Sequence, residues 1–338
     1  MTGFAPPSPA PSPILRSPVG FLLIPEFTVI GLSSAIEPLR IANRYLESKY
    51  RWRLLSIDGR AVADDNGILI HAEASLDDPG AIGTLMICAD LRPERFVTRA
   101  VVRRLRALDR AGVVLGAIDT GAFVLARAGL LDGHRVTMHW EQMEVFSERY
   151  PTIEPAGTLF EMDARRLSCA GGTAALDMML TAIGIDHGDS LAQRVADHCL
   201  HERIRSGSTR QRGNRGEREC ARHPGLRRAL RLLAAHPGRA YSNSELAREC
   251  ALSVRHLTRL FEQELGQSPR EHQRVQRLDR ARTLLRNGEA QIAEVALAAG
   301  FKSPAHFSRA YRALFDHAPS SERKACAPAP RLVMDRGE

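Results

Sequence analysis

Two stretches of the first half of the chain carry side chains that could bind or transform a small molecule. Residues 117–121, Ala-Ile-Asp-Thr-Gly, place a carboxylate between a continuous apolar run and a helical pattern. Ligands of open α/β sheets bind beyond the carboxyl ends of the strands, which is where Asp119 is expected. His139, Trp140 and Glu141 form the second stretch. Two carboxylates and an indole suit a cation through ion pairing and cation–π contact, so these four residues predict an effector site.

Each of these residues also has a structural interpretation, which the sequence leaves open. Asp119 could cap the helix that follows it, a position that aspartate favours. His139 could be a hydrogen-bonded structural histidine, and Trp140 an ordinary core residue. We expect no metal and no cofactor, because the sequence has neither an H-E-x-x-H motif nor clustered cysteine and histidine.

A different chemistry is indicated by residues 241–323, which contain one pattern twice. Ser253 precedes His-Leu-Thr-Arg-Leu-Phe at 256–261, and Ser303 precedes His-Phe-Ser-Arg-Ala-Tyr at 306–311. Each copy predicts a short helix, a tight turn and a second helix that begins at the serine. Two copies are too few for a solenoid and instead indicate two helix-turn-helix units in one small domain.

Local signals place the ends of these helices. Ser242 and Glu245 match a capping box, and Gly300 can adopt the positive φ of a turn. Pro304 stands at the first helical position after Ser303. Between the units, residues 269–286 predict one amphipathic helix with a basic side, about 24 Å long, which could hold two recognition helices near the spacing of one DNA turn, about 34 Å.

The distribution of charge agrees with a nucleic-acid partner for the second half of the chain. The 338 residues have a net charge of +8, yet residues 218–326 carry 20 Lys and Arg against 11 Asp and Glu, or +9. The rest of the chain is therefore close to neutral, at −1. A phosphate-binding module requires such a concentration of positive charge, whereas a merely soluble surface does not.

Residues 222–324 resemble the AraC/XylS family of bacterial regulators. The resemblance rests on Gly300-Phe301-Lys302-Ser303, Phe307-Ser308-Arg309-Ala310-Tyr311, Phe315 and Pro319-Ser320-Ser321-Glu322-Arg323. It implies operator DNA and RNA polymerase as partners. By resemblance, the residues facing the major groove are Arg255, Thr258 and Arg259 in the first unit, and Pro304, Ala305, His306 and Arg309 in the second. Two residues depart from the family pattern, Asp316 in place of glycine and Glu322 in place of an aromatic residue.

Arginines at such positions allow two interpretations. Arginine can donate two hydrogen bonds to the edge of a guanine. It can instead neutralise a phosphate or lie on a solvated face. The sequence leaves both open for Arg259 and Arg309.

The first half of the chain alternates apolar runs with helical patterns, which predicts a flavodoxin-like, doubly wound parallel sheet. Strands are expected at 19–24, 52–57, 85–88 and 113–118, and helices at 32–43, 93–111, 122–128, 173–185 and 186–205. An all-α double helix-turn-helix domain follows. The predicted boundaries are a Pro-rich disordered tail at 1–17, a sensor domain at 18–205, a linker at 206–219, a DNA-binding domain at 220–326 and a tail at 327–338.

Residues 19–205 resemble the class I glutamine amidotransferase-like fold of the PfpI type, in the form fused to AraC-type domains. The resemblance rests on Phe123-Val124-Leu125-Ala126, Gly129-Leu130-Leu131-Asp132-Gly133, His139-Trp140-Glu141 and Cys169-Ala170-Gly171-Gly172-Thr173-Ala174. The catalytic members carry a cysteine where this chain has Asp119. A carboxylate does not act as a thiolate does, so we expect no catalytic residues and no enzyme activity.

The sequence thus predicts a cytoplasmic transcription regulator whose inactive amidotransferase-like domain senses a small nitrogenous metabolite, an amino acid or a quaternary amine. By resemblance it activates a catabolic operon and forms a homodimer through the N-terminal domain. The alternatives are a PfpI-type hydrolase or deglycase with a DNA-binding tail, and an architectural DNA binder without an effector. Six dispersed cysteines indicate reduced thiols, and neither a membrane span nor a secretory signal is expected.

Overall fold

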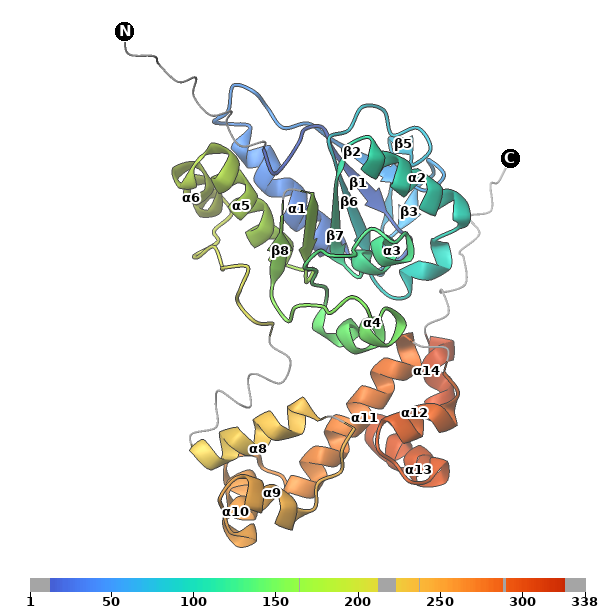
Figure 1. Ribbon diagram of the computed structural model, residues 1–338, viewed down its shortest axis with the longest axis vertical. Coiled ribbons are helices and arrows are strands. Elements are labelled where there is room, and N and C mark those ends of the chain that lie inside the picture. The colour runs from blue at the N-terminus through green and yellow to red at the C-terminus, as the bar shows by residue number, and fades with distance from the viewer. Residues whose placement is uncertain (1–12, 164, 212–222, 237, 288–289, 326–338) are drawn as a thin grey trace, which may run out of the picture. The chain divides into compact units, whose positions relative to one another are not determined.

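The computed structural model describes residues 13–163, 165–211, 223–236, 238–287 and 290–325. The chain divides into two compact units, Met1–Gln211 and Arg212–Glu338, and each is described by itself (Figure 1).

A twisted parallel sheet forms the centre of the first unit (Figure 1). In the described residues its strand order is β5-β2-β1-β6-β7-β9-β8, and only β8 runs antiparallel to its neighbour. The strands are β1 (Val19–Leu23), β2 (Trp52–Ser56), β5 (Ala74–Ser75), β6 (Thr84–Ala89), β7 (Val114–Asp119), β8 (Phe160–Met162) and β9 (Arg166–Cys169). A separate hairpin pairs β3 (Val62–Ala63) with β4 (Leu69–Ile70). The central strands β1, β6 and β7 are buried throughout, as expected for a sheet covered on both faces.

Helices cover both faces of this sheet. On one side, α1 (Val29–Ala42), α5 (Ala174–His187) and α6 (Asp189–His198) pack on one another. On the other side lie α2 (Arg99–Arg110) and α3 (Gly121–Arg127) (Figure 1). The short helix η1 (Pro93–Phe96) contacts α3. The short helices η2 (Trp140–Gln142) and α4 (Met143–Arg149) follow α3 in the chain. The predicted doubly wound fold is confirmed.

One predicted helix is split in the structure, and another is shorter than predicted. Thr98 accepts a hydrogen bond from the amide of Val101 and begins α2 afresh, so the segment 93–111 is a 3-10 turn and a separate helix. Gly188 has φ 95° and separates α5 from α6, so the helix predicted at 186–205 covers only Asp189–His198. In both places a residue suited to capping or turning interrupts the helical pattern.

Both ends of the first unit extend beyond the expected sensor domain. Residues 1–12 of the predicted tail lie outside the described residues, but Leu15 is buried and the amides of Ile14 and Leu15 donate to Asp186. At the other end, Gly207 and Thr209 accept hydrogen bonds from the amide of Leu159. The segment 206–211, predicted to begin the linker, is therefore hydrogen-bonded to the first unit. Residues 212–219 of that linker lie outside the described residues.

The described part of the second unit is all-α, as predicted. Its helices are α8 (Pro224–Ala235), α9 (Asn243–Glu249), α10 (Val254–Leu265), α11 (Pro269–Asn287), α12 (Ile292–Ala298), α13 (Pro304–Phe315) and α14 (Pro319–Ala325). In the first helix-turn-helix, α9 and α10 pack on α8 around Leu246, Leu257 and Phe261. The second, α12 and α13, packs on α11.

The predicted helix starts of the second unit are present. Ser242 and Glu245 form a capping box at α9. The hydroxyls of Ser253 and Ser303 accept from backbone amides three residues later, at 3.2 and 3.4 Å. Gly300 has φ 76° in the second turn. Each recognition helix therefore begins at a serine that satisfies one of its unpaired amides.

The arginines of α11 serve a role that the predicted basic side did not include. Arg277 donates to the carbonyl of Gly300 at 3.1 Å, and Arg280 to that of Ala298 at 2.8 Å, where α12 ends. Arg282 and Arg286 pair with Glu322 of α14. These side chains hold α12, the turn after it and α14 against α11, because they satisfy two backbone carbonyls and the carboxylate of Glu322.

Among the described residues, no helix is long and apolar enough to cross a membrane. Cys88, Cys169, Cys199 and Cys250 are free thiols, and Cys220 and Cys326 lie outside the described residues.

Candidate effector site and DNA-binding surface

Asp119 is the last residue of β7 and lies at a sharp strand-to-helix turn. Its φ of 59° is in the left-handed region, which non-glycine residues seldom adopt. Its side chain is buried, with 7% of the residue exposed. The N-cap of α3 is Thr120, whose hydroxyl donates to the carbonyl of Asp90. The interpretation of Asp119 as a helix cap is therefore wrong, because the helix begins one residue later.

The backbone after β9 forms one wall around Asp119. Gly171 and Gly172 have φ 84° and 52°. A Cβ atom on Gly171 would overlap the carboxyl group of Asp119. Glycine is required there on two grounds, positive φ and the close approach of a buried side chain.

Three further carboxylates lie around this end of the sheet, and our sequence analysis missed all three. Asp90 directly follows β6, Glu26 follows β1, and Asp65 follows β3. Asp90 and Asp65 interact electrostatically with Asp119, while Glu26 is paired with Arg95. The signal that could have found Asp90 and Glu26 was their place at the ends of apolar runs, because carboxyl ends of parallel strands meet at one edge.

Burial and like charges shift the acidity of this cluster. Burial, followed by Asp90 and Glu141, raises the pKa of Asp119 well above its ordinary value, and the amide of Thr120 only partly opposes this. Burial, with Asp65, Glu141 and Glu26, raises the pKa of Asp90 to about 6. Neighbouring carboxylates without a cation raise the free energy of each other's charged form. A positive charge beside these carboxylates would favour their ionised forms.

The structure joins the predicted residues His139 and Glu141 to this cluster. Glu141 interacts electrostatically with both Asp119 and Asp90. Burial lowers the pKa of His139, although Glu141 opposes the shift. Trp140 is 44% exposed and its ring lies 5.6 Å from that of His139. The interpretation of Trp140 as a core residue is wrong, because its side chain is exposed.

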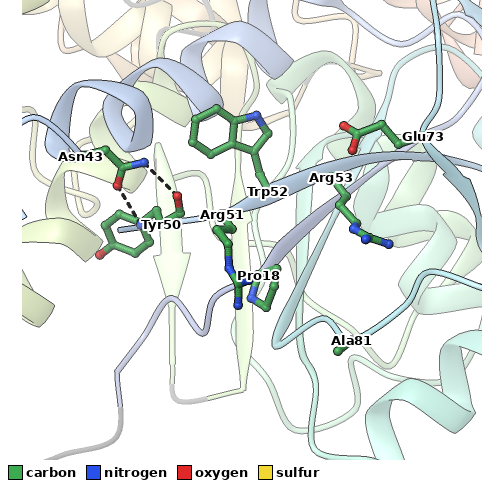
Figure 2. A pocket seen from close by; sticks show the side chains of 8 residues that line it. All are labelled: Pro18, Asn43, Tyr50, Arg51, Trp52, Arg53, Glu73 and Ala81. Atoms are coloured by element: carbon green, nitrogen blue, oxygen red, sulfur yellow. Dashed lines mark hydrogen bonds between the residues drawn. The ribbon is translucent and has the colours of Figure 1, made fainter. Parts of the chain in front are cut away.

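A separate cavity of about 510 Å³ lies at the opposite end of the sheet. It is lined in part by Pro18 and Trp52, at the amino ends of β1 and β2. Arg51 and Arg53 point to one side of β2 and Trp52 and Glu73 to the other (Figure 2). These polar groups do not converge on one point (Figure 2).

The recognition helices α10 and α13 expose the residues predicted to read DNA. Arg255, Arg259, Pro304, Ala305, His306 and Arg309 are exposed. Thr258 is half-buried, and its hydroxyl donates to the carbonyl of Val254 at 3.0 Å. Next to the arginines, Leu260 and Ala310 are buried, so the guanidinium groups project while their neighbours pack inward.

Within the described part of the second unit, Arg255, Arg259 and Arg309 have no ion-pair partner. Because these three guanidinium groups form no ion pair there, they remain available for phosphates or base edges. The described residues contain no group of three or more side chains that could hold a metal ion.

Comparison with known proteins decides the family. Residues 19–183 match the DJ-1/PfpI family, and residues 246–325 match a helix-turn-helix domain. The chain is 42% identical over 303 residues to the HTH-type transcriptional regulator CdhR of Pseudomonas aeruginosa, a match that covers 90% of each chain. The chain belongs to the AraC-type transcriptional regulators with a DJ-1/PfpI domain.

Further relatives agree with this family. The AraC-type chain is 39% identical over 327 residues to the regulator GbdR of Pseudomonas aeruginosa, covering 96% of this chain and 88% of the relative. It is 38% identical over 309 residues to the regulator GlxA of Rhizobium meliloti, covering 90% and 95%. A THiJ/PfpI family protein from Pseudomonas syringae matches at a TM-score of 0.50 and 17% identity, over 73% of this chain and 96% of the other, and shows the fold alone. The protein is therefore a DNA-binding transcriptional regulator.

Proposed function

We propose that the first unit senses a small cationic nitrogenous metabolite, an amino acid or a quaternary amine, and has no catalytic activity. The observation that carries this proposal is the buried carboxylate of Asp119 at the strand-to-helix turn, surrounded by Asp90, Asp65 and Glu141. On the family resemblance, the regulator acts in the cytoplasm as a homodimer through its N-terminal domain. It activates a catabolic operon together with RNA polymerase.

Electrostatics support a cation as the ligand. Opposite unit charges 4 Å apart attract by about 4 kcal/mol at an effective dielectric constant of 20. Asp119 and Asp90 have raised pKa values because burial and like charges penalise their ionised forms. A cation beside them removes part of that penalty. The exposed indole of Trp140 offers a face for a quaternary or primary ammonium.

We propose that the first unit lacks catalytic activity because of the side chain at its strand-to-helix turn. The PfpI-type enzymes that the fold resembles use a thiolate there, and this chain has a carboxylate. The relatives CdhR, GbdR and GlxA are transcriptional regulators by name. His139 remains nearby without a thiol partner at position 119.

The test is a thermal-shift screen of the full-length protein against amino acids and quaternary amines, with matched neutral and anionic compounds. Cationic compounds should raise Tm, because a ligand that binds only the folded state stabilises it. Asp119→Ala should remove the shift and the effector's influence on DNA binding, while DNA binding itself persists. The matched control is Asp132→Asn, a change at an exposed carboxylate. Shifts that survive in Asp119→Ala, or arise only with anions, would reject the proposal.

One observation keeps the alternative of a hydrolase or deglycase testable. The left-handed φ of Asp119 preserves the sharp turn on which the enzymes of this fold present their nucleophile. The wild-type protein should lack both activities. Hydrolase or deglycase activity in Asp119→Cys would show that the rest of the catalytic scaffold survives, and activity in the wild type would favour the alternative.

A further inference from the structure

The internal repeat of the second unit continues past the recognition helices. After α10 the chain turns at Gly266, with φ 68°, and α11 begins at Pro269. After α13 it turns at Asp316, with φ 62°, and α14 begins at Pro319. Gly266 and Asp316 are 50 positions apart, as are Pro269 and Pro319, so the two turns are equivalent. Asp316 adopts the left-handed conformation that Gly266 adopts in the first turn.

Behind each recognition helix, one residue of the following helix is buried at the equivalent position. In the first copy this is His272 of α11, whose ring lies 5.5 Å from that of Phe261 and whose Nδ1 lies 2.9 Å from the amide of Gln267. In the second copy it is Glu322 of α14. The two copies thus use an aromatic pair and an ionic group for the same structural position.

Glu322 joins three helices of the second copy. Only 1% of the residue is exposed. Its carboxylate accepts from the hydroxyl of Tyr311 on α13 at 2.8 Å, and from Arg282 and Arg286 on α11 at 2.7 and 2.8 Å. His317 lies 3.2 Å away, in the turn before α14. Tyr311 replaces Phe261 of the first copy, so the hydroxyl that meets the carboxylate exists only in the second.

In this cluster, the arginine charges and the hydrogen bonds to Glu322 offset the cost of burying its carboxylate. Burial alone would raise the pKa of Glu322, but hydrogen bonds from Arg286 and Tyr311 and the charges of both arginines outweigh it and lower the pKa. Removing one member of such a buried group leaves the others uncompensated, which is more costly than the loss of an exposed pair. The family's aromatic residue at this position could not accept these three hydrogen bonds.

We propose that Glu322 is a positioning residue for the second recognition helix, which it holds through Tyr311 against α11. Tyr311 lies two residues after Arg309, so a change in the seating of α13 moves the side chain expected to reach DNA. The first recognition helix has no such dependence, because the pair Phe261 and His272 is independent of Glu322. Base reading by the second copy therefore depends on a carboxylate that contacts no DNA.

The experiment compares full-length variants on a DNA duplex selected by the wild-type protein from random sequences. Tyr311→Phe gives the second copy the residue of the first, and Glu322→Gln removes the charge at nearly constant shape. Both should weaken binding about tenfold or more and relax base preference at the half-site read by α13, with preference at the other half-site unchanged. The double variant should lose no more than the stronger single variant, because both changes break the same contact.

The matched control is Glu271→Gln, which removes the same charge from the exposed side of α11 and should leave base preference intact. Circular dichroism confirms that each variant is folded, and Tyr311→Phe, which deletes a single oxygen atom, serves if Glu322→Gln does not fold. Equal loss at both half-sites, additive losses in the double variant, or unchanged binding in Tyr311→Phe would each overturn the proposal.

Discussion

The side-chain amide of Gln211 donates a 2.7 Å hydrogen bond to the backbone carbonyl of Met138, the residue directly before His139. A second attachment lies nearby in the chain, where Arg205 donates to the hydroxyl of Thr173 at 2.8 Å and to the buried carboxylate of Asp177 at 2.7 Å. Thr173 directly follows the two glycines beside Asp119. The last described residues of the first unit therefore form hydrogen bonds on two sides of the candidate effector site, next to His139 and next to Gly172.

We expect this attachment to carry the effector signal toward the linker. Gln211→Ala should leave the effector-induced rise in Tm intact but reduce the effector's influence on DNA affinity several-fold, because the segment no longer follows Met138. Gln193→Ala on the exposed side of α6 is the control. Fluorescence anisotropy with labelled DNA, with and without the compound found by thermal shift, measures the effect. An unchanged response in Gln211→Ala would contradict this route.

The raised pKa of Asp119 predicts how the stability of the first unit depends on pH. The unfolded chain loses this proton near pH 4, whereas the folded state keeps it to higher pH. Stability of the wild type should therefore fall, relative to Asp119→Asn, as pH rises above about 4. Within the window between the two pKa values, the difference in free energy of unfolding grows by about 1.4 kcal/mol per pH unit.

Both tryptophans, Trp52 and Trp140, lie in the first unit, so urea unfolding followed by their fluorescence reports on that unit alone. Measurements at pH 5, 6, 7 and 8 should show the divergence of the two proteins. A constant difference across this range would mean that Asp119 titrates normally in the folded state.

The projection of Arg259 and Arg309 from equivalent turns of α10 and α13 predicts two separable effects on DNA reading. If each donates to a guanine edge, replacement by alanine should cost about 1–3 kcal/mol and relax one base position. The two affected positions should lie about one helical turn apart. Selection from random DNA distinguishes this from phosphate contact, in which affinity falls on all sequences and the salt slope shrinks by about one.

Ala251 predicts a stabilising change. It ends the turn after α9 with φ 55°, a conformation that costs a non-glycine residue about 1–2 kcal/mol. Ala251→Gly should therefore raise the free energy of unfolding of the second unit by about 0.5–1 kcal/mol, after the entropy of glycine is included. Arg248→Gly, within α9, should have the opposite sign. Differential scanning calorimetry measures both, and destabilisation by Ala251→Gly would show that the turn is not strained.

Most of the architecture could be predicted because its signals are local. The serine caps before α10 and α13, the buried runs of β1, β6 and β7, and the strand-to-helix turn at Asp119 all follow from short stretches of sequence. The break between α5 and α6 was predicted between residues 185 and 186 and lies at Gly188, because the helical pattern continues up to the glycine.

The candidate site could be predicted only in part, because its remaining groups meet through the fold. Asp90, Asp65 and Gly171 come from three separate loops, and only Asp90, at the end of an apolar run, carries a local signal that it lies near Asp119. The same reason hid the roles of Arg277, Arg280 and Glu322. Their partners are carbonyls, a phenol and guanidinium groups of other helices, so a basic side and a departure from a family pattern were all that the sequence could show.

The burial of Asp119 among other acids has a consequence for what the regulator measures. If a cationic effector binds beside this carboxylate, as proposed, it favours the ionised form, whereas burial and the neighbouring carboxylates favour the protonated form. Protons and effector then compete, and apparent affinity should rise with pH, which titrations at pH 6 and 8 would reveal. At a constant concentration of effector, a bacterium whose interior turns acidic would respond as though the metabolite had become scarce.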